Sequence, residues 1–386
     1  MLKDLLHKID EFLEKHRWIL VFLLALPFVN QGFPNFYYVY VWLHDWQKVV
    51  SLLILIWFCF RRKHKLTKLP LIAIVSEVWL VIMTVLNHGF EDMSVYEDLY
   101  NRSSGILFLV LIADIFSDQI DHVCNGLMLN YEIAIYPYFA GLFFKLFPVV
   151  TKPRGLMNTF IMVLLPAMFL ALVHLVQKKQ VIRSVVLLVC SLLTVWKFWC
   201  ATTVVAVLAA CAVLLFGFIT WKLLKHKISL SAFLFLSLLL NLFVLFVYSG
   251  GMFPWIDTFI QSFLKRSTTF TERTIIWEEA IRMIKGKPLF GYGIWPLIHA
   301  ENSYASVYTH AHNELLQQYL EGGVIRFVLF LAFHAELARK VDKKKNSFVR
   351  IVAIAFIFGL SMTYITESYE RSYLLFAIPI LSYYLK

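Results

Sequence analysis

The feature that most constrains this chain is a series of apolar runs, each close to the length needed to cross a lipid bilayer. A helix needs about 20 apolar residues to span a hydrocarbon core of roughly 30 Å. The runs lie at residues 18–38, 48–60, 69–86, 103–117, 131–150, 155–176, 181–198, 201–221, 229–249, 323–339, 351–366 and 372–385. Because 60% of residues are hydrophobic and only 16% are charged, an ordinary soluble protein is excluded. The pattern predicts an all-α, polytopic membrane protein with about 12 transmembrane helices.

Basic residues indicate which ends of these helices face the cytoplasm, because cytoplasmic loops carry an excess of Lys and Arg. If the N-terminus is cytoplasmic, the loops on that side hold the basic clusters within residues 3–17, 61–68, 178–183, 222–227 and 339–350. The loop at residues 91–98 is acidic and falls on the opposite side. Both termini are therefore expected to be cytoplasmic. The net charge of +11 reflects these loop clusters rather than one basic stripe, so nucleic acid is not an expected partner.

Two domain-level expectations follow. Residues 1–17 place apolar side chains on one helical face and charged ones on the other, which is typical of a helix lying in the inner membrane interface. No small-residue cleavage site follows the first run, so this segment is expected to remain in the mature protein. Residues 18–386 are expected to form a single transmembrane domain.

One long segment, residues 250–322, separates two apolar runs and is predicted to be external. Loops of this length are usually functional or disordered. Here residues 272–285 predict an amphipathic helix, and a second short helix is expected to start at an Asn313 cap and to end at Gly322 and Gly323. An ordered, helical loop is therefore expected.

Four motifs in this loop carry a resemblance to a known family: Arg273-x3-Trp277, Pro288-x2-Gly291-x-Gly293, His312-Asn313-Glu314 and Glu321-Gly322-Gly323. In this order, and followed by an apolar run, they resemble the external loop of the bacterial O-antigen ligase and polysaccharide polymerase superfamily. The resemblance implies a GT-C-like glycosyltransferase of the bacterial cytoplasmic membrane, with one large helical extracytoplasmic loop. The implied donor is an oligosaccharide on undecaprenyl diphosphate, the implied acceptor is a second lipid-linked repeat, and a chain-length regulator protein is a further implied partner.

On this interpretation His312 is the catalytic residue. A neutral imidazole can take a proton from a sugar hydroxyl, which is the general-base step that a glycosyl acceptor needs. Asn313 and Trp277 are expected to support it. Outside the motif context, a histidine near a helix start would more often only bind backbone groups.

The departing diphosphate is expected to be neutralised by Arg273 together with one or more of Lys197, Arg326 and Arg154. A guanidinium suits this role because it binds phosphate oxygens in a two-bond fork. Lys197, Arg326 and Arg154 also lie near the outer ends of predicted helices, where a cation can reach lipid headgroups without any function.

No metal and no other cofactor are expected. His310, His312, His299 and Glu301 could suggest a metal site, but residues 250–322 contain one Asp, Asp257, and no paired acidic motif of the kind that holds Mg²⁺ or Mn²⁺ at a diphosphate. Fixed cations would then supply the charge stabilisation.

Three functions stay open. A polymerase is favoured because the family is richer in polymerases, and the alternative is a ligase that transfers the glycan to a lipopolysaccharide core. The second alternative is a flippase or transporter of polyprenyl-linked sugars, which would use Glu77 near the middle of its run.

Overall fold

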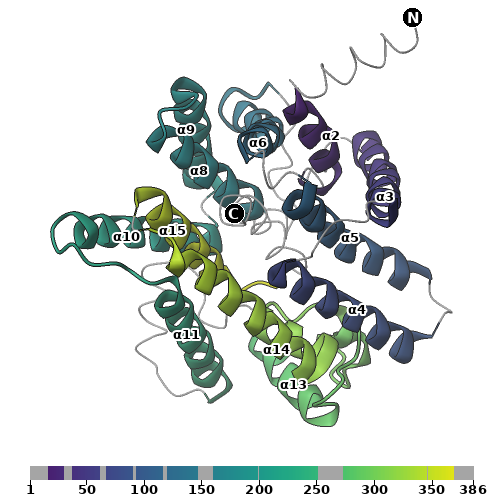
Figure 1. The fold of residues 1–386 in the computed structure, drawn as a ribbon. Coiled ribbons are helices and arrows are strands. Elements are labelled where there is room, and N and C mark those ends of the chain that lie inside the picture. The colour runs from purple at the N-terminus through teal and green to yellow at the C-terminus, as the bar shows by residue number, and fades with distance from the viewer. Residues whose placement is uncertain are drawn as a thin grey trace, which may run out of the picture. The chain divides into compact units, whose positions relative to one another are not determined.

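The computed structural model describes residues 16–29, 37–60, 67–89, 93–115, 120–146, 160–198, 200–250, 273–345 and 347–368. Within them the regular structure is helical and no strand occurs (Figure 1). The helices are α2 (Arg17–Val29), α3 (Tyr37–Phe60), α4 (Lys68–His88), α5 (Met93–Ile115), α6 (Ile120–Phe144), α8 (Ile161–Val176), α9 (Val181–Phe198), α10 (Ala201–Lys222), α11 (Leu230–Gly250), α13 (Arg273–Gly286), α14 (Glu314–Lys343) and α15 (Phe348–Thr363), with 3-10 turns η2 (Pro296–His299) and η3 (Ala305–Val307). The all-α prediction is confirmed for this part of the chain.

Each apolar run within these ranges coincides with a helix, and the differences are at the ends. The run at 181–198 matches α9 at both ends, whereas α6 begins at Ile120, well before the run predicted from 131. Polar residues hid the start of α6, because buried Asn130 donates to the Gly126 and Phe22 carbonyls instead of facing water. The run at 372–385, nearly all of the segment 1–17, and Arg154 lie outside the described residues.

Two of the described helices, α4 and α10, are long and apolar enough to cross a membrane by length and composition. Shorter apolar helices include Ile161–Val176, Leu230–Phe246 and Phe348–Thr363. The count of twelve crossings stays a prediction.

The chain divides into two compact units. Unit 1 comprises residues 1–66, 104–200 and 372–386, and unit 2 comprises residues 67–103 and 201–371. In unit 1, α2 packs on α6, and α8 packs on α9. In unit 2, α4 packs on α14, α10 packs on α15, and both α11 and α13 contact α14.

Small residues let the unit 2 helices approach closely. A Cβ at Gly359 of α15 would lie 2.7 Å from the Ala206 carbonyl oxygen of α10, and one at Gly217 of α10 would lie 2.6 Å from the Ile351 side chain. Glycine and alanine at such crossings are typical of helix packing in membranes, where dispersion contacts replace the hydrophobic effect.

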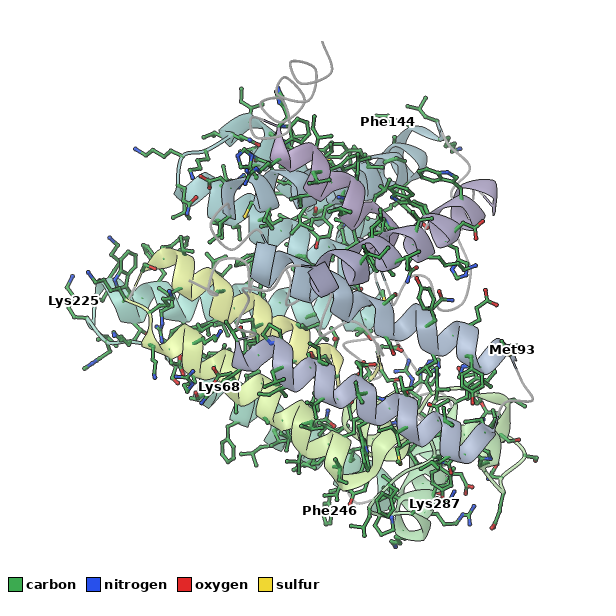
Figure 2. The ribbon with its side chains drawn as sticks, turned by 45° about the vertical axis from the view of Figure 1, so that its right-hand side comes forward. Lys68, Met93, Phe144, Lys225, Phe246 and Lys287 are labelled. Atoms are coloured by element: carbon green, nitrogen blue, oxygen red, sulfur yellow. The ribbon has the colours of Figure 1, made fainter. Side chains whose placement is uncertain are left out.

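Figure 2 shows how unit 2 is arranged from end to end. Lys68 at the start of α4 and Lys225 in the turn after α10 lie toward one end, whereas Met93 and Lys287 lie toward the other. The sequence predicts the first two for the cytoplasm and the last two for the outside. The external loop motifs therefore lie at the end of unit 2 that the charge pattern assigns to the outside.

Candidate active site

His312 and Arg273 meet at the carboxylate of Glu367, and these three residues come from separate parts of unit 2. His312 Nδ1 lies 3.2 Å from one oxygen of Glu367, and an Arg273 Nη donates to the other oxygen at 2.5 Å. Glu367 is 4% exposed, whereas the side chains of His312 and Arg273 are 18% and 17% exposed. Glu367 is therefore the buried partner that His312 and Arg273 share, and the side chains of His312 and Arg273 remain partly exposed.

The residue before His312 is fixed by buried hydrogen bonds. Trp277 Nε1 donates to the Ala311 carbonyl at 3.0 Å, and the Ala311 amide donates to the Gln317 side chain at 2.7 Å. Trp277 is 1% exposed in a core cluster with Ala280 and Leu316. Trp277 thus links the helix that begins at Arg273 to the residue before His312, and its supporting role stays a prediction.

The residue after His312 is fixed as well. The Asn313 side chain accepts from the Leu316 amide at 3.1 Å, so it caps α14 as predicted. Its amide group donates to Asn241 at 2.8 Å and to the Ile365 carbonyl at 3.1 Å. The second of these bonds ties the loop to the turn after α15, which brings Glu367 beside His312.

His312 itself adopts a left-handed backbone conformation, with φ of +50°. Residues with a side chain rarely adopt this region, and such strain persists only where neighbours over-determine it. The hydrogen bonds of Ala311 and Asn313 supply this constraint on His312. The His310 ring lies 4.2 Å from the His312 ring, centroid to centroid, and the Tyr308 ring meets it edge-on at 5.8 Å.

The electrostatics favour an ionised Glu367. Burial acts to raise the pKa of this carboxyl, but the hydrogen bond from His312 and the charge of Arg273 outweigh it and hold the pKa below its ordinary value. A carboxylate can only accept hydrogen bonds, so His312 donates through Nδ1–H; in the neutral imidazole the lone pair then lies on Nε2. The imidazole is thereby oriented to accept a proton at Nε2.

The same residues include a set that could hold a metal ion. His310, His312 and Glu367 offer ligand atoms that all lie within 4.8 Å of one another. Counting ligands within the loop alone missed this set, because Glu367 lies outside the loop. Arg273 occupies the same carboxylate and places a fixed positive charge there, which disfavours a divalent cation.

The glycine motifs have a structural role. Gly291 and Gly323 both have positive φ, and a Cβ on Gly323 would lie 2.2 Å from the Leu289 carbonyl. The two segments are joined by bonds from the Tyr292 amide to Leu320 and from the Gly293 amide to Glu321. This crossing breaks α14 at Gly322 and Gly323, as the sequence predicted.

Arg326 does not lie with Arg273. Its side chain is buried and forms salt bridges with Glu321 and, at 3.3 Å, with Glu77. Glu77 also accepts from Ser103 at 3.0 Å. Two carboxylates thus already bind this guanidinium. This favours a structural role, in which Arg326 holds α4 against α14, rather than contact with a substrate anion.

The remaining predicted cation in the described residues is Lys197, in the last turn of α9 in unit 1. It is exposed, with its Nζ 6.0 Å from the Phe143 ring centroid.

Glu367 is the residue that sequence reasoning missed. It belongs to none of the loop motifs and is 55 residues from His312. The one signal available was an acidic residue directly after an apolar run, on the side predicted to be external.

Residues 200–331 match the family model described as O-antigen ligase, which covers α10, α11, α13 and the His312 loop. A comparison with curated proteins gives no match. Members of this family are membrane enzymes of the glycosyltransferase type, acting as ligases or polymerases. Over the matched segment and its loop motifs, the chain is similar to the O-antigen polymerase and ligase superfamily.

Proposed function

We propose that this protein is a polysaccharide polymerase that transfers a glycan from undecaprenyl diphosphate to a hydroxyl group of an acceptor lipid-linked repeat. The observation that carries the proposal is the arrangement of His312, Glu367 and Arg273, which combines an oriented base with a fixed cation. The reaction would take place on the outer side of the bacterial cytoplasmic membrane, with both termini of the chain in the cytoplasm.

In the proposed reaction His312 Nε2 removes the proton of the acceptor hydroxyl as its oxygen attacks the anomeric carbon of the donor. Glu367 stabilises the imidazolium that forms, because the proton on Nδ1 already points at its carboxylate. The bond from the anomeric carbon to the diphosphate oxygen breaks on the opposite face, so the product has inverted configuration. The electron pair leaves with the diphosphate.

Arg273 would neutralise that departing diphosphate. A guanidinium carries five N–H donors, and one Nη of Arg273 binds Glu367, so the group retains donors for phosphate oxygens. Lys197 and Arg154 remain candidates for further contacts with the diphosphate. The salt bridges of Arg326 favour a structural role for it, and the one that it forms with Glu77 weakens the case for a transporter.

The experiment that tests this function uses purified protein with lipid-linked repeat units, with and without a lipopolysaccharide core acceptor. A polymerase lengthens the glycan without the core. Transfer only to the core would make the protein a ligase, and movement of lipid-linked sugars across vesicles without any new glycosidic bond would make it a transporter. An arm with excess EDTA tests the metal set: activity that is lost and then restored by a divalent cation would contradict the fixed-cation mechanism.

A further inference from the structure

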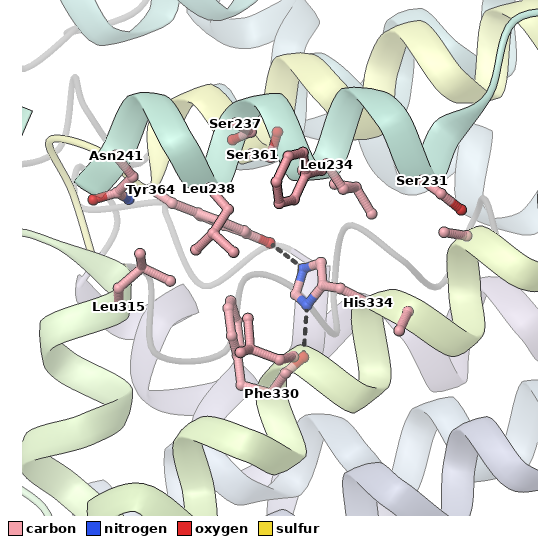
Figure 3. Close-up of a pocket in the computed structure, with 14 residues that line it drawn as sticks. Ser231, Leu234, Ser237, Leu238, Asn241, Leu315, Phe330, His334, Ser361 and Tyr364 are labelled. Carbon is pink, nitrogen blue, oxygen red and sulfur yellow. Dashed lines mark hydrogen bonds between the residues drawn. The ribbon is translucent and has the colours of Figure 1, made fainter. Parts of the chain in front are cut away.

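A cavity of about 290 Å³ lies between α11, α14 and α15 of unit 2 (Figure 3). Its walls are mainly apolar, with Leu234 and Leu238 from α11 and Phe330 from α14. The volume is near the lower end of the roughly 300–1,000 Å³ found for small-ligand pockets. The cavity is therefore large enough for part of a lipid chain.

Polar groups in the wall are engaged with the protein. His334 binds the Phe330 carbonyl through Nδ1 at 2.9 Å and the Tyr364 hydroxyl through Nε2 at 3.3 Å, as the dashed lines in Figure 3 show. The Ser361 hydroxyl donates to the Phe358 carbonyl, and the Asn241 side chain accepts from Asn313. The surface that these groups leave for an occupant is hydrocarbon in character.

One end of the cavity adjoins the candidate active site. Lining residues extend along α11 from Ser231 to Asn241, a rise of about 15 Å at 1.5 Å per residue. Asn241 binds Asn313, the residue after His312. Tyr364 lies at the same end in Figure 3, and its backbone carbonyl accepts a hydrogen bond from the Glu314 amide. From that end the cavity extends into the helices predicted to cross the bilayer.

The cavity also reaches the surface of these helices. Phe235 of α11 is 61% exposed, and Ala335 of α14 is exposed, although both line the cavity. A hydrocarbon chain could thus enter from the bilayer while its polar end stays beside His312.

We infer that this cavity binds the part of the donor's polyprenyl chain nearest the diphosphate, an inference that rests on the proposed function. The cavity is far smaller than a complete polyprenyl chain, so only the first isoprene units would fit and the rest would remain in the bilayer. Binding there places the diphosphate at the Asn241 end, on the side of Arg273 and His312.

The test is photo-crosslinking of the purified full-length protein with a polyprenyl diphosphate that carries a photoreactive diazirine in its second isoprene unit. Peptides from α11 and α14 should be labelled, and excess undecaprenyl diphosphate should abolish the labelling. Labelling that persists with this competitor but is lost with excess phosphatidylglycerol would assign the cavity to bulk lipid and overturn the inference.

Two variants narrow the cavity from different helices, Leu238→Trp and Ala335→Trp. Each should reduce labelling about tenfold, because losing the burial of two CH₂ groups at about 0.8 kcal/mol each has that effect. The matched controls are Leu239→Trp and Val328→Trp, at exposed positions on the same helices that do not line the cavity. Equal labelling in all four variants would contradict the inference.

The failure of this inference can be distinguished from failure of the proposed function. Labelling of α11 and α14 in a protein that transfers no glycan would support the lipid site and contradict the polymerase. Glycan transfer with the label on other helices would contradict the lipid site alone.

Discussion

Glu367 gives His312 a defined orientation and tautomer. Its carboxylate is buried, it accepts from Nδ1, and Arg273 holds its second oxygen. His312 alone would be a strained loop residue with a polar ring. Together the three side chains separate two tasks, proton removal at Nε2 and charge neutralisation at the guanidinium.

The first prediction concerns Glu367→Gln. The amide keeps the shape of the side chain but removes the charge that stabilises the imidazolium, so turnover should fall about 10²-fold while donor binding changes little. Single-turnover rates and donor affinity measure both effects. Glu301→Gln, at an exposed glutamate in the loop that holds His312, is the control and should behave as wild type. A wild-type turnover rate in Glu367→Gln would contradict the role of Glu367 in stabilising the imidazolium of His312.

The second prediction concerns Arg273. Arg273→Ala should weaken donor binding as well as turnover, and Arg273→Lys should recover only part of the loss, because an ammonium group cannot form the two-bond fork. Arg282→Ala is the control on the same helix, since Arg282 pairs with Glu279 and Glu301 rather than with the Glu367 cluster. Donor affinity that is unchanged in Arg273→Ala would contradict the diphosphate role.

At the scale of elements, the backbone crossing at Gly291 and Gly323 positions the loop against α14. The crossing uses hydrogen bonds from the Tyr292 and Gly293 amides, and it breaks α14 into the short helix after His312 and the long helix that follows. The glycines are needed where two backbones touch, not for chemistry. A substitution there should affect stability before it affects catalysis.

The third prediction compares two glycines of similar backbone conformation, Gly323 and Gly89. Gly323→Ala should lower the free energy of unfolding by more than the ~1–3 kcal/mol of positive-φ strain, because its Cβ would also lie 2.2 Å from the Leu289 backbone. Gly89→Ala has φ of +60° and nothing within 4 Å, so it should show the strain alone. Thermal unfolding followed by tryptophan fluorescence measures the difference. Equal losses in both variants would contradict the close crossing.

At the scale of the whole molecule, the charge pattern assigns the two ends of unit 2 to opposite sides of the membrane. The fourth prediction is that Ser303→Cys is labelled in intact cells by an impermeant thiol reagent, whereas Lys225→Cys is labelled only after permeabilisation. Both variants are made in a background without the native cysteines. Both positions are exposed in the structure, so a difference in labelling reports which side of the membrane each one faces. Labelling of position 225 but not of position 303 in intact cells would contradict the predicted orientation in the membrane.

The sequence predicted helices well where the apolar pattern was continuous, as in α9, and poorly where buried polar residues interrupted it, as at Asn130 in α6. Local motifs also located His312, Arg273 and the Asn313 cap. Pairings across the fold were out of reach, because Glu367 is 55 residues from His312 and Glu77 is 249 residues from Arg326. Only packing reveals that Arg326 has carboxylate partners.

The most direct test of the whole account is the single-turnover transfer rate of purified His312→Ala with a lipid-linked repeat unit as donor and acceptor. Loss of the general base should lower the rate by about 10²–10⁴-fold while donor affinity stays near the wild-type value. A folded, membrane-inserted His312→Ala protein that forms glycosidic bonds at the wild-type rate would contradict the proposed mechanism.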